Sequence, residues 1–188
     1  MKILSIDIDY MYSPLLSEYD DLVKGKSISI EEQKKILSAA GFTPMVNLEK
    51  KKSVTKYLSR LNCMPIPKVI CQNHDEILAF IGNLPTVTIV NIDHHHDVFY
   101  PGWHDINVVD EGNWVHHLSK RTELDYTWVR NKDSENLLNN VKIDFLYKEL
   151  YLEELGKKEF DLIFICTSPH WTGNDRINVV QELLCEMI

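Results

Sequence analysis

A short segment in the middle of the chain carries metal-binding side chains at alternate positions. Residues 93–97 read D-H-H-H-D and directly follow the apolar run Val87–Ile92. If the segment is extended, Asp93, His95 and Asp97 project from one face, because strand side chains alternate between two faces. Carboxylate and imidazole ligands suit manganese, iron or zinc, and no thiolate is expected nearby. The segment predicts a divalent metal site, with a solvated polar loop as the alternative.

Two other apolar runs end in residues of the same kind. Lys2–Ile8 leads through Asp7 to Asp9, two acids that share a face by the same parity. An unpaired buried carboxylate is costly, so a metal ion could compensate them, as could strand-end hydrogen bonds or an arginine. His74 follows the run Lys68–Cys71 at a turn into a helix, where it is either a ligand or a capping or packing residue.

These positions together supply four carboxylates and two imidazoles. One divalent ion would have too many anionic ligands, whereas two ions bridged by carboxylates and a water balance the charge better. The sequence therefore predicts a binuclear site. Its ligands are expected to be Asp7, Asp9, His74, Asp93, His95 and Asp97.

The elements that position these side chains alternate between buried strands and helices. The expected strands are Lys2–Ile8, Lys68–Cys71, Val87–Ile92 and Leu162–Cys166. The expected helices run from Ile30, after the cap Ser29, to a stop at Gly41, and over Ser53–Leu61, Asp75–Ile81, Leu137–Leu155 and Asn174–Met187. This alternation predicts one α/β domain over residues 1–188, a three-layer sandwich with a mostly parallel sheet. Such sheets bind ligands at the carboxyl ends of their strands, where the candidate ligands lie.

The composition limits the class of protein. The 188 residues include 28 acidic and 20 basic side chains, for a formal net charge of −8, which argues against a broad nucleic-acid surface. No apolar run reaches the roughly 18–20 residues of a membrane span. The four cysteines form no C-x-x-C pair, so neither a zinc finger nor a disulfide framework is expected. We expect a soluble, cytoplasmic protein that binds neither nucleic acid nor membrane, in an oligomeric state that the sequence leaves open.

The three motifs resemble those of the arginase (ureohydrolase) superfamily. Residues 93–97 are similar to its D-x-H-x-D manganese motif, Ser5–Asp9 to its S-x-D-x-D motif, and Gln72–Asp75 to the turn that carries its histidine ligand. The S-x-D-x-D element comes first here and last in arginases, which implies a circular permutation. The early D-x-D-Y element and the late segment Thr167–Gly173 are similar to those of small peptide arginases, which convert arginine in peptides to ornithine.

The resemblance implies an arginase-like fold and two Mn²⁺ ions, although the ligand types would also accept iron or zinc. It implies hydrolysis of the guanidino group of an arginine, in a peptide or a small guanidino substrate, to ornithine and urea by a metal-activated hydroxide. Asp97 would pass the proton to the leaving amine, and His116 would be the proton relay. The implied ligands are His74, Asp93, Asp97 and Asp7 for one ion and His95, Asp93, Asp7 and Asp9 for the other.

Several residues near the motifs could contact the substrate. Acidic side chains at 110 and 111 could pair with a guanidinium, although they could also be plain turn residues. Side chains after the last apolar run should face the same end of the sheet, where a tryptophan could stack on a guanidinium or pack in the core. The substrate-binding candidates are Glu111, Asn113, Ser168, His170 and Trp171.

Three other functions use the same ligand types. A zinc-dependent deacetylase of the related fold typically holds one ion with two aspartates and one histidine. A binuclear phosphoesterase would usually bring an arginine or lysine near the site, and none closely follows these motifs. A non-catalytic metal-binding domain would be expected to have lost some ligands. Two metal ions per chain would favour the guanidino hydrolase, one the deacetylase, and none a binding module.

Overall fold

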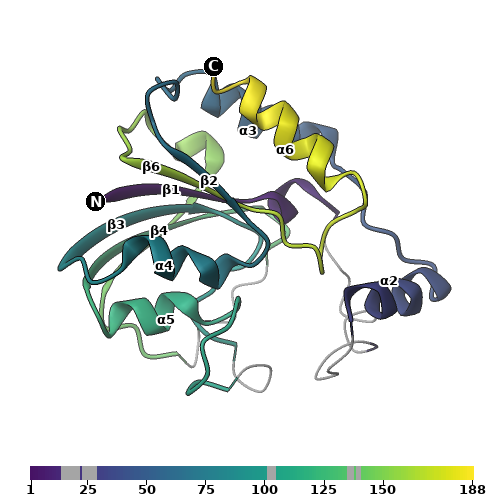
Figure 1. Ribbon diagram of the computed structural model, residues 1–188, viewed down its shortest axis with the longest axis horizontal. Coiled ribbons are helices and arrows are strands. Elements are labelled where there is room, and N and C mark those ends of the chain that lie inside the picture. Colours follow the sequence, from purple (N-terminus) through teal and green to yellow (C-terminus); the bar gives the residue numbers. More distant parts are fainter. Residues whose placement is uncertain (14–21, 23–28, 101–104, 135–137, 139–140) are drawn as a thin grey trace.

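The computed structural model describes residues 1–13, 22, 29–100, 105–134, 138 and 141–188. Six strands form a parallel sheet at the centre of the molecule (Figure 1). They are β1 (Lys2–Asp7), β2 (Lys68–Cys71), β3 (Thr86–Ile92), β4 (Glu123–Arg130), β5 (Leu146–Tyr151) and β6 (Leu162–Cys166). Their order across the sheet is β2-β6-β1-β3-β4-β5, and each neighbouring pair is parallel.

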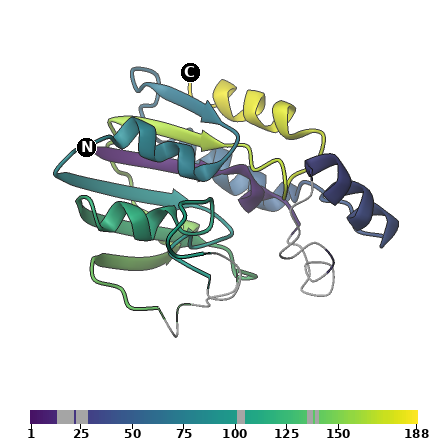
Figure 2. The same ribbon diagram turned by 60° about the horizontal axis from the view of Figure 1, so that its bottom comes forward.

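Helices cover both faces of the sheet (Figures 1 and 2). On one face lie α3 (Leu48–Leu58) and α6 (Arg176–Cys185), and on the other lie α4 (Ile77–Ile81) and α5 (Trp114–Ser119). In Figure 1, α2 (Ile30–Ala39) extends past the carboxyl ends of the strands. The predicted α/β fold with three layers is therefore confirmed.

The central strands bury both faces because apolar residues fill nearly every position. In β1, Leu4 and Ile6 belong to the core beneath α3 and α6, whereas Ile3 belongs to the core beneath α4 and α5. Each of the five residues of β6 is buried. Strands with apolar side chains on both faces are typical of covered parallel sheets. A polar residue within such a strand, such as the buried Ser5, therefore needs a partner.

Local signals in the sequence set the ends of two helices. Ser29 caps α2, since its Oγ accepts a hydrogen bond from the N–H of Glu32 at 3.2 Å. Gly41 follows the end of α2 with a φ of 92°, a conformation that glycine adopts without strain. The next helix, α3, begins after Asn47 rather than at Ser53, because the side chain of Asn47 caps it.

The predicted helix Leu137–Leu155 is wrong. The part of that range that the structure describes contains β5 and the 3₁₀ helix η4 (Leu152–Glu154). Leu146 and Leu150 are spaced as on one face of a helix, but they also have the parity of a strand. Pairing with β4 decides between the two, because strand formation depends on neighbours more than on local propensity.

The order of the strands reverses beside β1. The chain places β2 and β6 on one side of β1 and β3, β4 and β5 on the other. In open parallel sheets, ligands bind at the carboxyl ends of strands where the order reverses. The residues that follow β1, β2, β3 and β6 therefore meet at one edge of the sheet. None of the described helices combines the length and the apolar character needed to cross a membrane.

Candidate metal centre

The six predicted ligands lie together at the carboxyl end of the sheet, and we refer to them as the ligand cluster. They come from three strand ends: from β1 and the 3₁₀ helix η1 (Ile8–Met11), from the 3₁₀ helix η2 (His74–Glu76) after β2, and from the segment after β3. All of them except His95 are buried. The cluster consists of Asp7, Asp9, His74, Asp93, His95 and Asp97.

One part of the cluster, the inner group, consists of His74, Asp93 and Asp97. His74 Nδ1 lies 3.0 Å from Oδ2 of Asp93 and 3.0 Å from Oδ2 of Asp97, and Asp7 Oδ2 is 3.4 Å away. The other ring nitrogen, Nε2, contacts Ser5 Oγ at 2.7 Å. That contact fixes the ring with Nδ1 facing the carboxylates. Within the described residues, Nδ1 is buried and makes no hydrogen bond, as is expected of an atom that faces a cation site.

The second part, the outer group, consists of Asp9, Asp93 and His95. His95 Nδ1 lies 2.9 Å from Asp9 Oδ2 and 3.8 Å from Asp93 Oδ1. Asp93 therefore belongs to both groups, with Oδ2 toward His74 and Oδ1 toward His95. A carboxylate with one oxygen in each group has the arrangement needed to bridge two cations.

The cluster forms by a different route from the extended strands that were predicted. Residues 93–97 bend after β3, and Asp97 has a φ of 53°. Asp9 lies in η1, where its N–H donates to Oδ1 of Asp7 at 3.0 Å. The parity argument for a shared face is therefore wrong for both segments. The side chains converge because the backbone turns at each strand end.

Hydrogen bonds hold the carboxylates in place. Trp114 Nε1 donates to Asp97 Oδ2 at 2.8 Å, and the N–H of Val115 donates to the backbone oxygen of Asp97 at 3.1 Å. Asn91 Nδ2 donates to Asp93 Oδ2 at 3.0 Å. The start of α5 and the end of β3 therefore orient the two aspartates of the inner group.

These positioning residues were not identified from the sequence. Asn91 and Ser5 had a detectable signal, because each is a polar residue inside an apolar run that forms a buried strand. Trp114 had none, because nothing in its neighbourhood in the sequence connects it to Asp97. That contact depends on how α5 packs on the sheet.

Burial and neighbouring charges shift the pKa values of the cluster strongly. Burial, reinforced by nearby carboxylates, raises the pKa of Asp9 and of Asp93 to about 7. Burial would lower the pKa of His95, but the charges of Asp9 and Asp93 outweigh it and raise that pKa to about 10. Burial would also lower the pKa of His74, but its contacts with Asp7, Asp93 and Asp97 outweigh burial, and that pKa lies well above the usual value. Buried acids in such numbers are costly unless cations compensate them, which a divalent ion does.

The candidate relay His116 is not brought to the cluster by its described contacts. Burial lowers its pKa, and its charged neighbours are Lys120, His117 and Asp144. The side chain of Asn113 is buried in the turn before α5, where its amide donates to backbone oxygens at 2.7 and 3.1 Å. The structure therefore gives Asn113 a structural role in that turn.

Three of the four remaining substrate-binding candidates interact with residues of the cluster, and His170 does not. Burial, with the charge of Asp7 next, raises the pKa of Glu111 to about 7. Ser168 Oγ donates to Asp7 Oδ2. The ring of Trp171 lies 5.8 Å from that of His95. His170, which precedes Trp171, instead faces α2.

His170 is held by a residue that was not considered from the sequence. Its Nδ1 lies 2.7 Å from Gln33 Oε1, and its backbone oxygen accepts from Gln33 Nε2 at 3.3 Å. Gln33 belongs to α2 and is buried. This pair of contacts attaches α2 to the loop after β6.

A cysteine thiol lies beside the cluster, although none was expected as a ligand, and burial with the charge of Asp7 raises its pKa well above the usual value. Cys166, the last residue of β6, belongs to a third group of potential ligands together with Asp7 and His74. The sequence placed it in an apolar run, where a buried free thiol is the ordinary outcome. Its proximity to the cluster follows from the strand order, since β6 lies between β1 and β2.

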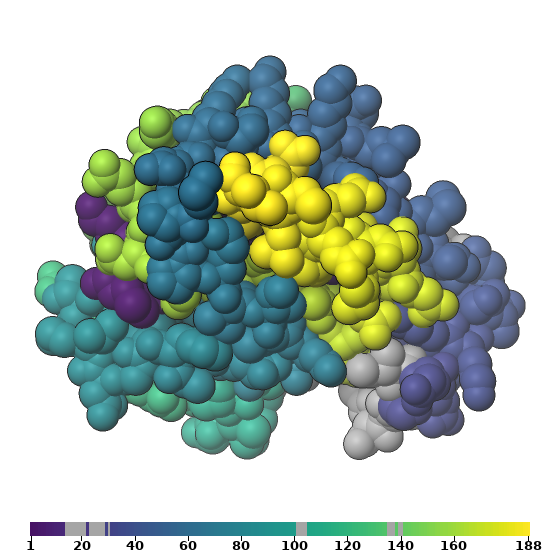
Figure 3. All heavy atoms as spheres, turned by 45° about the horizontal axis from the view of Figure 1, so that its top comes forward, coloured from purple at the N-terminus to yellow at the C-terminus, as the bar shows by residue number. Residues whose placement is uncertain are grey.

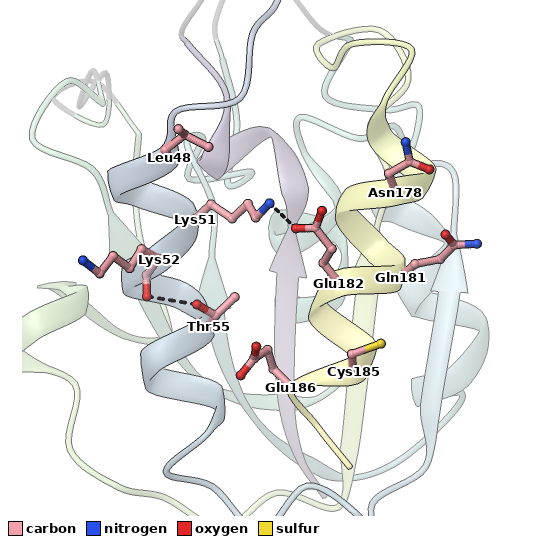
Figure 4. Close-up of a pocket in the computed structure, with 9 residues that line it drawn as sticks. All are labelled: Leu48, Lys51, Lys52, Thr55, Asn178, Gln181, Glu182, Cys185 and Glu186. Carbon is pink, nitrogen blue, oxygen red and sulfur yellow. Dashed lines mark hydrogen bonds and ion pairs between the residues drawn. The ribbon is translucent and has the colours of Figure 1, made fainter.

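In Figure 3 the helices α3 and α6 lie side by side at the surface. A separate groove of about 610 Å³ lies between them (Figure 4). An ion pair between Lys51 and Glu182 spans it (Figure 4). None of its lining residues belongs to the ligand cluster. They are Leu48, Lys51, Lys52, Thr55, Asn178, Gln181, Glu182, Cys185 and Glu186.

The chain matches no protein-family model, no curated protein sequence and no solved structure.

Proposed function

We propose that this protein is a binuclear metal-dependent hydrolase that cleaves the guanidino group of an arginine to ornithine and urea. The observation that carries the proposal is the position of Asp93, whose two carboxylate oxygens face His74 and His95 separately. The ligand set, and the buried His74 Nδ1 that makes no hydrogen bond within the described residues, fit divalent cations. The motif resemblance favours two Mn²⁺. Two divalent ions there would lower the pKa of a water toward neutrality.

The protein's own residues supply the proton transfer. Asp97 accepts a proton from the attacking water and returns it to the leaving amine. Its Oδ2 accepts the indole N–H of Trp114, which holds the carboxylate in a fixed orientation. His116, whose described contacts lie elsewhere, is not needed in this sequence of steps.

Two residues near the cluster suit a cationic side chain. Glu111 has a pKa of about 7, so a guanidinium beside it would favour its ionised form. Trp171 lies beside His95, the ligand that is most open to solvent, and offers a ring on which a guanidinium can stack. The partial exposure of His95 favours an arginine within a peptide over free arginine.

A zinc-dependent deacetylase is the second candidate. The inner group taken alone, with His74, Asp93 and Asp97, has the one-histidine, two-aspartate composition of such a site. The outer group argues against it, because a single-ion enzyme has no use for Asp9 and His95. Acetyl-lysine peptides are therefore the comparison substrate.

The test is urea release by metal-loaded protein. Free arginine and arginine-containing peptides are incubated with the protein, and the peptides are weighed for the loss of one CH₂N₂ unit, which balances addition of water and departure of urea. We expect urea and that mass loss from the wild type and from Asp144→Ala, which changes an exposed acid paired with Lys120. Asp93→Ala should abolish both. Metal-loaded protein that releases no urea would contradict the guanidino chemistry, and acetate release would favour the deacetylase.

A further inference from the structure

Cys166 is a buried thiol at the edge of the ligand cluster. It is the register partner of Asp7 in β1 and of Cys71 in β2. Its side chain is 0% exposed, and its Sγ lies within 4.8 Å of a ligand atom of Asp7 and of His74. Its S–H donates a hydrogen bond to the backbone oxygen of Gln72 at 3.2 Å, which metal binding would replace. The strand order thus places sulfur beside a carboxylate and an imidazole.

A second observation indicates that a cation belongs at this place. His74 Nδ1 is fully buried, makes no hydrogen bond within the described part of the chain, and faces into the cluster. Asp7 Oδ2 lies 3.4 Å from it. Ser168 Oγ contacts both Asp7 Oδ2 and the Sγ of Cys166, so carboxylate and sulfur belong to one contact network.

The donor types decide which metal suits this position. Manganese and magnesium prefer oxygen ligands, whereas thiolate sulfur selects zinc, iron or cobalt. A site with one sulfur, one imidazole nitrogen and one carboxylate oxygen should therefore prefer different metal ions from the outer group, whose ligand atoms are all nitrogen and oxygen. The two ends of the cluster have different chemistry.

We propose that Cys166 is a metal ligand together with Asp7 and His74, and that it makes the inner end of the cluster select Zn²⁺ or Fe²⁺ over Mn²⁺. The inference rests on the proposed function because it concerns the same metal centre, and it replaces one of the two Mn²⁺ ions that the motif resemblance favours with Zn²⁺ or Fe²⁺. Binding replaces the thiol hydrogen with the metal, and the proton leaves to solvent. The outer group, which contains no sulfur, keeps its preference for harder ions.

The test uses Co²⁺ as a spectroscopic probe of sulfur ligation. Thiolate bound to Co²⁺ gives a charge-transfer band in the near ultraviolet that oxygen and nitrogen ligands do not give. We expect the band in the wild type and in the matched control Cys71→Ser, which changes the register partner on β2. A second control, Cys185→Ser, removes an exposed thiol. Cys166→Ser should bind Co²⁺ without the band.

Competition between metals gives the second measurement. Equilibrium dialysis should show that the wild type prefers Zn²⁺ to Mn²⁺ at the position that binds metal more tightly, which we expect to be the inner one. In Cys166→Ser that preference should fall by at least about 10-fold. Loss of a residue that only supports a ligand already weakens metal binding by about 10-fold to 100-fold, and loss of a ligand should cost no less.

X-ray absorption of the zinc-loaded wild type keeps the test independent of any variant's folding. A sulfur scatterer at about 2.3 Å from zinc is expected. Bound metal without sulfur, or a band that persists in Cys166→Ser, overturns the inference and leaves the metal centre intact. A wild type that binds no divalent metal overturns the proposed function as well.

Discussion

The inner and outer groups of the ligand cluster share Asp93 but differ in the exposure of their histidines, since Asp9 of the outer group is as buried as the inner carboxylates. In the inner group, the side chains of His74 and Asp97 are 2% and 5% exposed. In the outer group, that of His95 is 35% exposed. The same carboxylate therefore faces a closed position on one side and an open position on the other.

The surroundings of the two imidazoles differ in the same way. The ring of His74 lies 5.0 Å from that of Trp114 and 5.8 Å from that of Phe164, both in the core. The ring of His95 neighbours His94 and the partly exposed Trp171. We therefore expect an ion at the inner position to be held as part of the fold, and substrate and exchanging metal to enter at the outer position beside the more exposed His95.

Removal of the shared carboxylate should have the largest effect. Asp93→Ala takes a ligand from both groups, so we expect loss of both ions and a fall in urea release of more than about 100-fold, beyond the range seen for residues that only support ligands. Metal per chain, measured by atomic emission, and urea release check this. If Asp93→Ala kept two ions per chain, the bridging role of Asp93 would be wrong.

The two histidines should then separate the groups. His95→Ala should keep the inner ion and lose the outer one, because His74 and its partners are untouched. His74→Ala should lose the inner ion and lower the unfolding temperature further, since it also empties a space in the core. Metal content and thermal unfolding of the two variants give the measurements. Equal effects of the two substitutions would contradict the division into inner and outer groups.

Loss of a supporting hydrogen bond should have a smaller effect. Trp114→Phe removes the donor to Asp97 Oδ2 and should weaken binding of the inner ion by about 10-fold to 100-fold, with little change at the outer position. Trp128→Phe is the matched control, because that indole is equally buried and donates only to the backbone oxygen of Asp93, at 3.0 Å. Metal titration of both variants checks the prediction, and a larger loss in Trp128→Phe would contradict it.

The smallest effect concerns the metal-free protein. The pKa values of Asp9 and Asp93 are raised from 3.8 to about 7 and that of His95 from 6.5 to about 10, so each group binds its proton more tightly in the folded state. Their contribution to stability is present at low pH and is lost as the pH rises through those values. Asp7, whose pKa is lowered, acts in the opposite direction at acid pH.

With a chelator present, the unfolding temperature should therefore fall from pH 6 to pH 9. Divalent metal should reduce that fall, because it replaces the protons as the compensating charge. Thermal unfolding at several pH values, with and without metal, provides the measurement. The same pH dependence in both conditions would mean that metal does not reach these carboxylates.

The ligand cluster could be predicted because a parallel sheet brings the carboxyl ends of its strands together. Asp7, His74 and Asp93 each follow a short apolar run, so the strand signal and the ligand signal lie next to each other in the sequence. Because the two signals are adjacent, these residues could be predicted from the sequence, even though the extended geometry expected for residues 93–97 is wrong.

The missed features depend on contacts between distant segments. The sequence of β5 predicts part of a helix because its apolar spacing suits both a helix and a strand, and only its pairing with β4 decides between them. Cys166 looked like an ordinary core residue because its neighbour Asp7 lies on another strand. Neither contact leaves a local pattern, since both depend on the order of the strands in the sheet.

The most direct test of the account is the number of divalent ions that the wild-type protein binds. Metal-free protein is dialysed against increasing concentrations of metal, and the bound ions per chain are counted. We expect two ions that bind in separate steps, with the tighter step retained in His95→Ala. A protein that binds no divalent ion, or that binds two in equivalent steps, would contradict the binuclear site with an inner and an outer position.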